Sequence, residues 1–269
     1  MRDVVLVVAH RGSSMLHPEH TLAAYESAIS EGADALECDV RLTRDGVLVC
    51  VHDRRVDRTS DGRGVVSTLE MADLAELDFA SWKARHSDPL LEASWEEPDR
   101  DRSSSVLTLE RLLQLVLDHT RPVQLHVETK HPTRYGGLVE RSLVDLLSRY
   151  GLAEPLTRSV SRVTVMSFAA ISLRRLHALA PQLPTVLLLD RVPLRLRDGS
   201  LPLQVTVVGP SLEILKAHPR YVERVHAHGG QVHVWTVDAV ADIAAVLELD
   251  VDGVISNEPR RVLAQLGRV

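Results

Sequence analysis

The chain has 269 residues, of which 45% are apolar and 25% are charged. This composition is typical of a folded globular protein and excludes a collagen-like or disordered chain. Its net charge of −6 disfavours nucleic-acid binding and electrostatic attachment to an anionic membrane, because both need a basic surface.

The apolar runs are too short for a membrane protein. None approaches the roughly 18 residues that a membrane-spanning helix needs. The first run, 4–9, is also too short for a signal-peptide core, and no cleavage site follows it. Cys38 and Cys50 form no CxxC motif and are expected to be free thiols, as in a reducing compartment. We therefore expect a cytoplasmic protein without a stable membrane anchor.

Short runs rich in β-branched residues alternate along the chain with longer amphipathic stretches. Several of these runs, such as VVLVVA at 4–9, are apolar on both faces, as parallel strands covered on both sides should be. The predicted strands are 4–9, 33–42, 122–128, 163–167, 184–189, 203–208, 231–236 and 252–256.

Between the strands, apolar residues recur at helical spacing. The clearest such series are Leu109, Leu112, Leu113, Val116 and Leu117; Val139, Leu143, Leu146, Leu147 and Tyr150; and Ile243, Val246 and Leu247. Eight strands with intervening helices predict a closed (β/α)₈ TIM barrel, a fold that commonly needs about 250 residues. A doubly wound open sheet is the alternative. It usually has a glycine-rich loop after its first strand, where this chain has His10-Arg11-Gly12.

The longest interval between predicted strands follows the second one. Residues 43–53 predict a β-hairpin, with its turn at Arg44-Asp45-Gly46. Residues 54–105 are polar and predict an insertion that caps one mouth of the barrel. We expect one domain over residues 1–269 that contains this insertion. A surface loop without a role is the alternative.

Polar clusters occupy four predicted strand ends, although an apolar barrel does not require them. Residues i and i+2 of a strand share a face, so Glu37 and Asp39 point together, as do Glu128 and Lys130. The carboxyl ends of barrel strands form the face that carries active sites. The clusters are His10-Arg11, Glu37-Cys38-Asp39, His52-Asp53 and Glu128-Thr129-Lys130.

The acidic members of these clusters indicate a metal site. Glu37, Asp39 and Glu128 make an all-oxygen ligand set, which suits Mg²⁺ or Ca²⁺ rather than zinc. Arg11 and Lys130 lie nearby in the predicted barrel. One divalent cation, these two cations and the three carboxylates sum to +1, which suits a singly charged phosphodiester bound through the arginine fork and the lysine charge.

Two histidines remain at the same rim. Around a phosphate, His10 and His52 indicate a general acid and a general base. Hydrogen bonding at the barrel rim is the alternative interpretation of both. The sequence does not decide which histidine is the acid.

These clusters belong to a longer series of motifs, by which the chain resembles the glycerophosphodiester phosphodiesterase family over nearly its whole length. Each motif is common, whereas their order and spacing together are specific. They are His10-Arg11-Gly12, Pro18-Glu19-His20-Thr21, Glu37-Cys38-Asp39-Val40, His52-Asp53, Arg58-Thr59, Thr108-Leu109-Glu110, Glu128-Thr129-Lys130, Ser167-Phe168, Trp235-Thr236-Val237 and the segment 252–259.

The resemblance implies a TIM barrel, one divalent cation and hydrolysis of small-molecule glycerophosphodiesters to glycerol 3-phosphate and an alcohol. It also implies metal binding by Glu37, Asp39 and Glu128, with acid–base roles for His10 and His52. Substrate would be held by the remaining site residues, which are Arg11, Lys130, Phe168 and Trp235.

Three positions depart from the family pattern, because His20, His126 and Asp238 stand where asparagine is usual. They place the substrate preference in question more than the reaction class. A phospholipase C or D on the same barrel is the nearest alternative enzyme, although no exposed aromatic or basic amphipathic segment for lipid docking is evident. A Schiff-base aldolase through Lys130 is disfavoured because Glu128 would keep the lysine charged. A non-catalytic phosphodiester-binding protein is the alternative that is not an enzyme.

Overall fold

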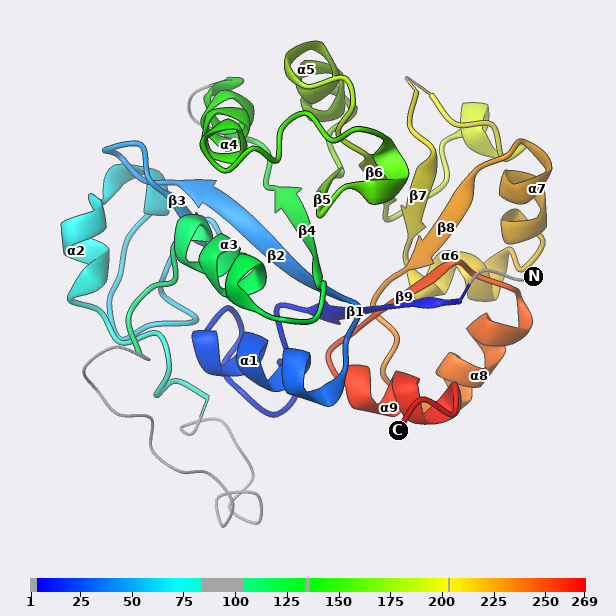
Figure 1. Cartoon of the computed structure of the whole chain (residues 1–269), viewed down its shortest axis with the longest axis horizontal. Coiled ribbons are helices and arrows are strands. Elements are labelled where there is room, and N and C mark those ends of the chain that lie inside the picture. The colour runs from blue at the N-terminus through cyan, green and yellow to red at the C-terminus, as the bar shows by residue number, and fades with distance from the viewer. Residues whose placement is uncertain (1–3, 84–103, 134–135, 203) are drawn as a thin grey trace.

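The computed structural model describes residues 4–83, 104–133, 136–202 and 204–269. Eight parallel strands close into a barrel, because β1 pairs with β9 on one side and with β2 on the other. Figure 1 shows the strands at the centre of the molecule and the helices around them. The predicted (β/α)₈ barrel is confirmed. The strands are β1 Leu6–His10, β2 Ala35–Leu42, β3 Leu48–Cys50, β4 Gln124–Thr129, β5 Val163–Ser167, β6 Thr185–Leu189, β7 Val207–Pro210, β8 Gln231–Val234 and β9 Gly253–Ser256.

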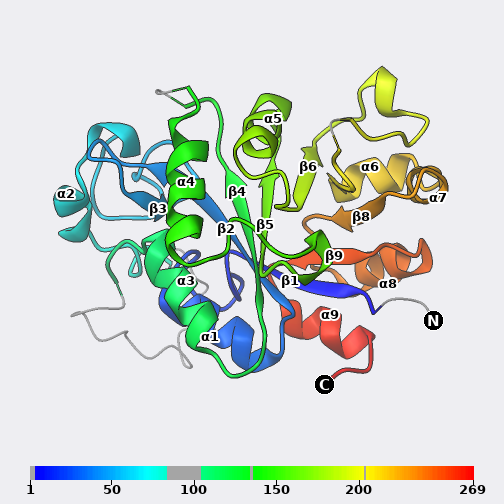
Figure 2. The ribbon, with the colours of Figure 1, turned by 45° about the horizontal axis from the view of Figure 1, so that its top comes forward.

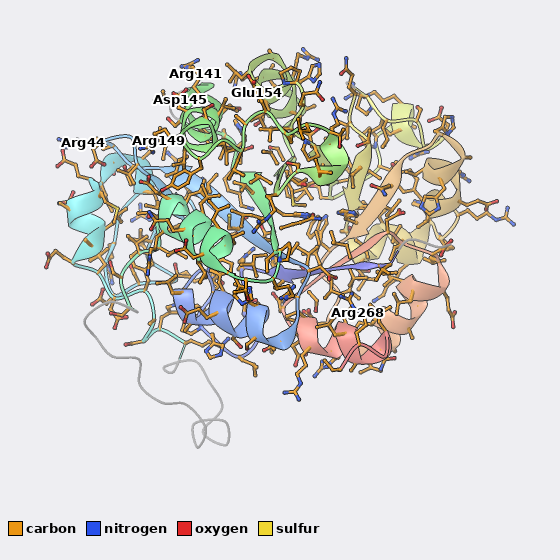
Figure 3. The ribbon with its side chains drawn as sticks, viewed as in Figure 1. Arg44, Arg141, Asp145, Arg149, Glu154 and Arg268 are labelled. Atoms are coloured by element: carbon orange, nitrogen blue, oxygen red, sulfur yellow. The ribbon has the colours of Figure 1, made fainter. Side chains whose placement is uncertain are left out.

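The helices cover the outside of the barrel with their apolar faces (Figures 1 and 2). In α4, Leu143 and Leu147 are buried, whereas Arg141, Asp145 and Arg149 project from its outer side (Figure 3). Among the described residues, no helix has the length and apolar character needed to cross a membrane. The helices are α1 Leu22–Glu31, α2 Met71–Ala75, α3 Leu109–Asp118, α4 Leu138–Arg149, α5 Ala170–Leu179, α6 Leu212–Ala217, α7 Tyr221–Ala227, α8 Val240–Glu248 and α9 Pro259–Gln265.

The sixth strand of the barrel lies further along the chain than the sequence predicted. The apolar pattern predicted a strand at 203–208, but β7 is Val207–Pro210. Leu203 itself lies outside the described residues. Gln204 has a left-handed backbone with a φ of 60°, and the Val205 amide donates to the Pro202 carbonyl, so this segment forms a turn. The other predicted strands agree with the observed ones to within two residues at each end.

The predicted hairpin at 43–53 is present and lengthens β2. β3 pairs antiparallel with the end of β2, and Gly46 in the turn has a φ of 88°. The last residues of β2 pair with this hairpin strand, so Glu37 and Asp39 lie inside β2 rather than at its end. They are nevertheless level with the ends of the neighbouring strands, because His10 pairs with Glu37 and Asp39 pairs with Glu128.

Two apolar layers support this arrangement. The larger one lies between strands and helices, where Leu36 and Val127 point outward from the barrel. The smaller one fills the barrel interior. Its buried members are Val8, Ala35, Met166, Val186, Leu188, Val207 and Ile255. The polar clusters therefore stand above an apolar interior, which is the general plan of barrel enzymes.

The described part of the predicted insertion packs beside the hairpin. It contains a 3₁₀ turn, Val66–Thr68, and α2, which Figure 1 shows next to β3. At its end, Lys83 Nζ donates to the carbonyls of Met15 and His17 at 2.8 and 2.9 Å, in the loop after β1. The segment 84–103 lies outside the described residues. The prediction that 54–105 caps the mouth stays a prediction.

Candidate active site

Three carboxylates converge inside the carboxyl-terminal mouth of the barrel. Glu37 and Asp39 come from β2 and Glu128 from β4, and each offers one oxygen within 4.8 Å of the other two. All three side chains are buried. The alternation of a strand puts Glu37 and Asp39 on one face, and the β2–β4 register adds Glu128 beside them.

Burial and mutual repulsion perturb the protonation of this cluster. Burial and the charge of Asp39 raise the pKa of Glu37 well above its usual range. The same two causes raise the pKa of Glu128 to about 7. Burial opposes ionisation of Asp39 as well, but Lys130, His20 and Arg11 hold its pKa well below the usual range. Without a further cation the three groups resist simultaneous ionisation, so this buried oxygen set fits a hard divalent ion.

Arg11 and Lys130 flank the acidic cluster. Arg11 Nε lies 3.0 Å from Asp39 Oδ2, and Lys130 Nζ lies 2.9 Å from Asp39 Oδ1 and 2.8 Å from Glu128 Oε1. Although burial opposes it, these two carboxylates raise the pKa of Lys130. A lysine kept charged in this way is a poor Schiff-base nucleophile, which argues against the aldolase alternative.

His10 is held at the edge of the cluster by a contact from the far end of the chain. Its Nδ1 lies 2.7 Å from Asn257 Oδ1, and its Nε2 lies 4.0 Å from Glu37 Oε2. Asp238 in turn accepts from the Asn257 side chain at 2.7 Å. Burial and the charge of Arg11 lower the pKa of His10 to about 4. Asn257 thus occupies Nδ1 and leaves Nε2 directed at the carboxylates.

His52 enters the site from the segment that follows β3. Its Nδ1 lies 2.7 Å from Asp53 Oδ1. Arg41 donates to the His52 carbonyl from Nε at 3.0 Å and from Nη2 at 2.7 Å. Burial lowers the pKa of His52. Asp53 and Arg41 therefore fix both the ring and the backbone of this residue.

A chain of ion pairs connects the loop that follows His10 with the loop that carries His52. Arg58 donates to both oxygens of Glu19, at 2.7 and 2.9 Å, and to Asp53 Oδ2 at 2.6 Å. Glu19 also accepts from Arg11 Nη1 at 3.0 Å. We call this group, Arg11–Glu19–Arg58–Asp53–His52, the Arg58 bridge. It ties the loop after β1 to the loop after β3.

Two aromatic side chains form the opposite wall. The rings of Phe168 and Trp235 meet edge to face with centroids 5.3 Å apart. Both line a cavity of about 230 Å³ together with His10, Lys130 and other residues of the mouth. Phe168 is 43% exposed. The cavity has one charged side and one apolar side.

The unusual histidines lie in different places. His20 contacts the cluster, with Nε2 3.0 Å from Asp39 Oδ2 and Nδ1 2.8 Å from Tyr25 Oη. His126 stacks on His233 instead, with ring centroids 5.8 Å apart and planes 7° apart. These two rings line a separate cavity at the amino-terminal mouth. His126 therefore packs as a buried histidine of the barrel interior.

The structure brings all nine predicted site residues to one mouth and adds partners that sequence reasoning did not assign. Asn257, Asp53, Glu19 and Arg58 all lie within the quoted motifs, and the i+1 spacing of Asp53 from His52 was a usable signal. Arg41 carried no signal, because it is simply a polar residue near the end of β2. Whether the nine residues have the predicted roles stays a prediction.

Known proteins resemble the chain in both sequence and fold. A family model described as the glycerophosphoryl diester phosphodiesterase family matches residues 10–261. The probable glycerophosphodiester phosphodiesterase 1 of Mycobacterium tuberculosis is 49% identical over 260 residues, which cover 97% of this chain and 92% of the relative. The glycerophosphodiester phosphodiesterase of Bacillus subtilis is 33% identical over 261 residues, covering 96% and 85%.

Solved structures share the fold. A phosphodiesterase from Oleispira antarctica, solved in complex with the product sn-glycerol-3-phosphate, has a TM-score of 0.81 at 23% identity and covers 97% of this chain and 96% of its own. A putative glycerophosphoryl diester phosphodiesterase from Silicibacter pomeroyi has the same TM-score at 24% identity, covering 98% and 94%. On the sequence matches, the chain belongs to the glycerophosphodiester phosphodiesterase family and is an enzyme of that class, a phosphoric diester hydrolase.

Proposed function

We propose that the chain hydrolyses glycerophosphodiesters to glycerol 3-phosphate and an alcohol, with one divalent cation and two histidines. The convergence of three carboxylates, two cations and two histidines at one mouth of the barrel carries this proposal. Membership of the family supports the substrate class. The product complex of the Oleispira relative supports it as well.

Glu37, Asp39 and Glu128 are proposed to hold the cation, which is Mg²⁺ or Ca²⁺. Their buried carboxylate oxygens match the hard-ligand preference of both ions. When bound, such an ion polarises phosphoryl oxygens and positions the nucleophile, which is either water or the neighbouring hydroxyl of the substrate glycerol. A bound cation also favours the charged form of all three acids.

Arg11 and Lys130 are proposed to hold the phosphate. Both side chains stay charged, lie beside the acidic cluster and line the cavity. Arg11 offers a planar pair of donors, whereas Lys130 offers a compact charge. Phe168 and Trp235 are proposed to pack against the carbon atoms of the substrate from the apolar side.

His10 and His52 are proposed to move the two protons of the reaction. One takes the proton of the nucleophile, and the other gives a proton to the departing alkoxide. Asn257 and Asp53 each contact an Nδ1, which leaves both Nε2 atoms for this chemistry. The Arg58 bridge keeps the loop that follows His10 and the loop that carries His52 in register.

A panel of glycerophosphodiesters tests this function. The protein is stripped of metal, supplied with Mg²⁺, Ca²⁺ or Mn²⁺, and assayed for glycerol 3-phosphate. We expect metal-dependent release of glycerol 3-phosphate from at least one substrate. If the folded protein binds the diesters but cleaves none of them with any of the three ions, the chain is a non-catalytic phosphodiester-binding protein. Cleavage on the other side of the phosphate, releasing glycerol and a phosphoryl alcohol, would also contradict the proposal.

A further inference from the structure

A row of three adjoining cavities, which we call the groove, leads away from the candidate active site toward the predicted insertion. A second cavity of about 270 Å³ shares His52, Glu128, Lys130 and Phe168 with the catalytic cavity. A third, of about 290 Å³, shares Arg41 and Lys130 with the second. Consecutive cavities therefore adjoin at the wall residues that they share. The catalytic cavity alone holds only about 230 Å³.

The far end of this groove is positively charged. The wall of the third cavity includes Arg41, Arg54 and Lys130, and among the described residues it includes no carboxylate. Ser67 and Thr133 add hydroxyl groups to it, and valines of the 3₁₀ segment and α4 complete it. This excess of positive charge is local, because the chain as a whole carries a net charge of −6.

Arg41 and Arg54 differ in the contacts that their side chains make. Arg41 binds the His52 carbonyl through Nε and Nη2, and so supports the catalytic histidine. Arg54 is the first residue of the predicted insertion, and its side chain is exposed. Its own carbonyl accepts from the Val66 amide, which fixes the backbone there. No ion pair or side-chain hydrogen bond joins the Arg54 guanidinium to the rest of the described chain.

We propose that this groove binds the alcohol part of the substrate, and that Arg54 selects alcohols carrying an anionic group over cationic alcohols. The inference rests on the proposed function, because it assigns a substrate class to the same site. Phosphate bound at the acidic cluster places one ester arm beside Phe168 and Trp235 and directs the other past His52 into the groove. At the far end of the groove, a quaternary ammonium meets the Arg54 guanidinium and no carboxylate in the wall, whereas a second phosphate group meets a complementary charge.

The same placement distinguishes the two histidines. An alcohol that leaves through the groove departs past His52, which lines both the catalytic and the second cavity, whereas His10 lines only the first of these. His52 therefore lies on the path of the departing alcohol in this proposal. Arg54 touches neither residue and so acts on selectivity alone.

Three substrates with the same glycerophosphoryl half test the selectivity. Glycerophosphocholine has a cationic alcohol, glycerophosphoglycerol a neutral one, and 1,3-bis(glycerophospho)glycerol an alcohol with a second phosphodiester. With saturating metal, we expect kcat/KM to rise in that order, by about tenfold between the first and the last, which corresponds to about 1.4 kcal/mol. Arg54→Gln should remove most of that ratio, and Arg54→Glu should reverse it in favour of choline.

The neighbouring arginine provides a matched control. Arg55 is also exposed but is paired with Asp57 and is absent from the groove wall, so Arg55→Gln should leave the selectivity ratio within twofold of the parent protein. Equal rates on the three substrates, a preference for choline, or an equal effect of Arg54→Gln and Arg55→Gln would overturn the inference while the proposed function stands. Failure to release glycerol 3-phosphate from any of the three with metal present would overturn both.

Discussion

Two pairs of histidines, one at each mouth of the barrel, lie in opposite surroundings. At the carboxyl-terminal mouth, His10 and His52 contact Asn257 and Asp53 and lie beside charged groups. At the amino-terminal mouth, His126 and His233 stack on each other, and the Nδ1 atom of each lacks a partner among the described residues. Burial lowers the pKa of His126 to about 3 and that of His233 to about 4.

This difference identifies what the proposed catalytic mouth has beyond a cavity lined by histidines. The amino-terminal cavity, at about 550 Å³, is larger than the catalytic one, yet its stacked rings are kept neutral by burial. Among the described residues, the carboxyl-terminal mouth combines three converging carboxylates with two cations and two histidines whose Nδ1 has a polar partner. The amino-terminal cavity has His226 paired with Asp252 beside the two stacked rings. The four predictions below test that contrast, beginning with the largest expected change in activity.

Replacement of His10 or His52, the proposed acid–base pair, should have the largest effect on kcat. Positioned proton transfer contributes about 10² to 10⁴ in rate, so His10→Ala and His52→Ala should each lower kcat by roughly that range. His126→Leu should change kcat by less than about threefold, because its ring contacts only the other mouth. Steady-state kinetics on an unactivated diester provides the comparison. Near-full turnover of both alanine variants, folded and metal-loaded, would show that the proton transfers lie elsewhere.

Loss of the residues that contact these two histidines should have the next largest effect on kcat. Asn257→Ala and Asp53→Ala each release one Nδ1 contact of 2.7 Å and free the ring to rotate. By analogy with the residues that orient metal ligands, we expect losses of about 10- to 100-fold in kcat with little change in KM. A rise in KM alone, with kcat retained, would mean that these residues bind substrate rather than orient a histidine.

The Arg58 bridge should have a smaller effect. Arg58→Ala removes three hydrogen bonds to Glu19 and Asp53 and should lower kcat by about tenfold, because both loops lose a common anchor. Arg55→Ala, whose arginine pairs only locally with Asp57, is the control. Millimolar guanidinium should restore part of the lost kcat of Arg58→Ala. Equal losses in both variants, without rescue, would contradict the positioning role.

The amino-terminal pair should affect stability rather than rate. The folded-state pKa of His126 is about 3, below the value of 6.5 for an unfolded chain. The unfolded state therefore binds more protons between these values, and the stability present above pH 6.5 is lost as the pH falls. His126→Leu should shrink the difference in unfolding free energy between pH 7 and pH 5 by about 2 kcal/mol. Denaturant titrations check this, with exposed His228→Gln as the control; an unchanged pH dependence would contradict it.

Prediction from the sequence succeeded where local patterns decide the structure. Apolar runs located the barrel strands, and i, i+2 spacing placed Glu37 with Asp39. It failed at β7, where Gln204 takes a left-handed conformation that apolar alternation does not reveal. It could not pair His10 with Asn257, which are 247 residues apart, because that contact exists only once β1 and β9 close the barrel.

Removal and return of the metal test the central claim most directly. Glycerol 3-phosphate release is measured after treatment with EDTA and again during titration with Mg²⁺ or Ca²⁺, with Asp39→Asn measured alongside. The account predicts that chelation abolishes turnover, that either or both ions restore it saturably in the parent protein, and that Asp39→Asn needs far more metal. Undiminished turnover in EDTA would show that Glu37, Asp39 and Glu128 are structural and that the chemistry proceeds without an ion.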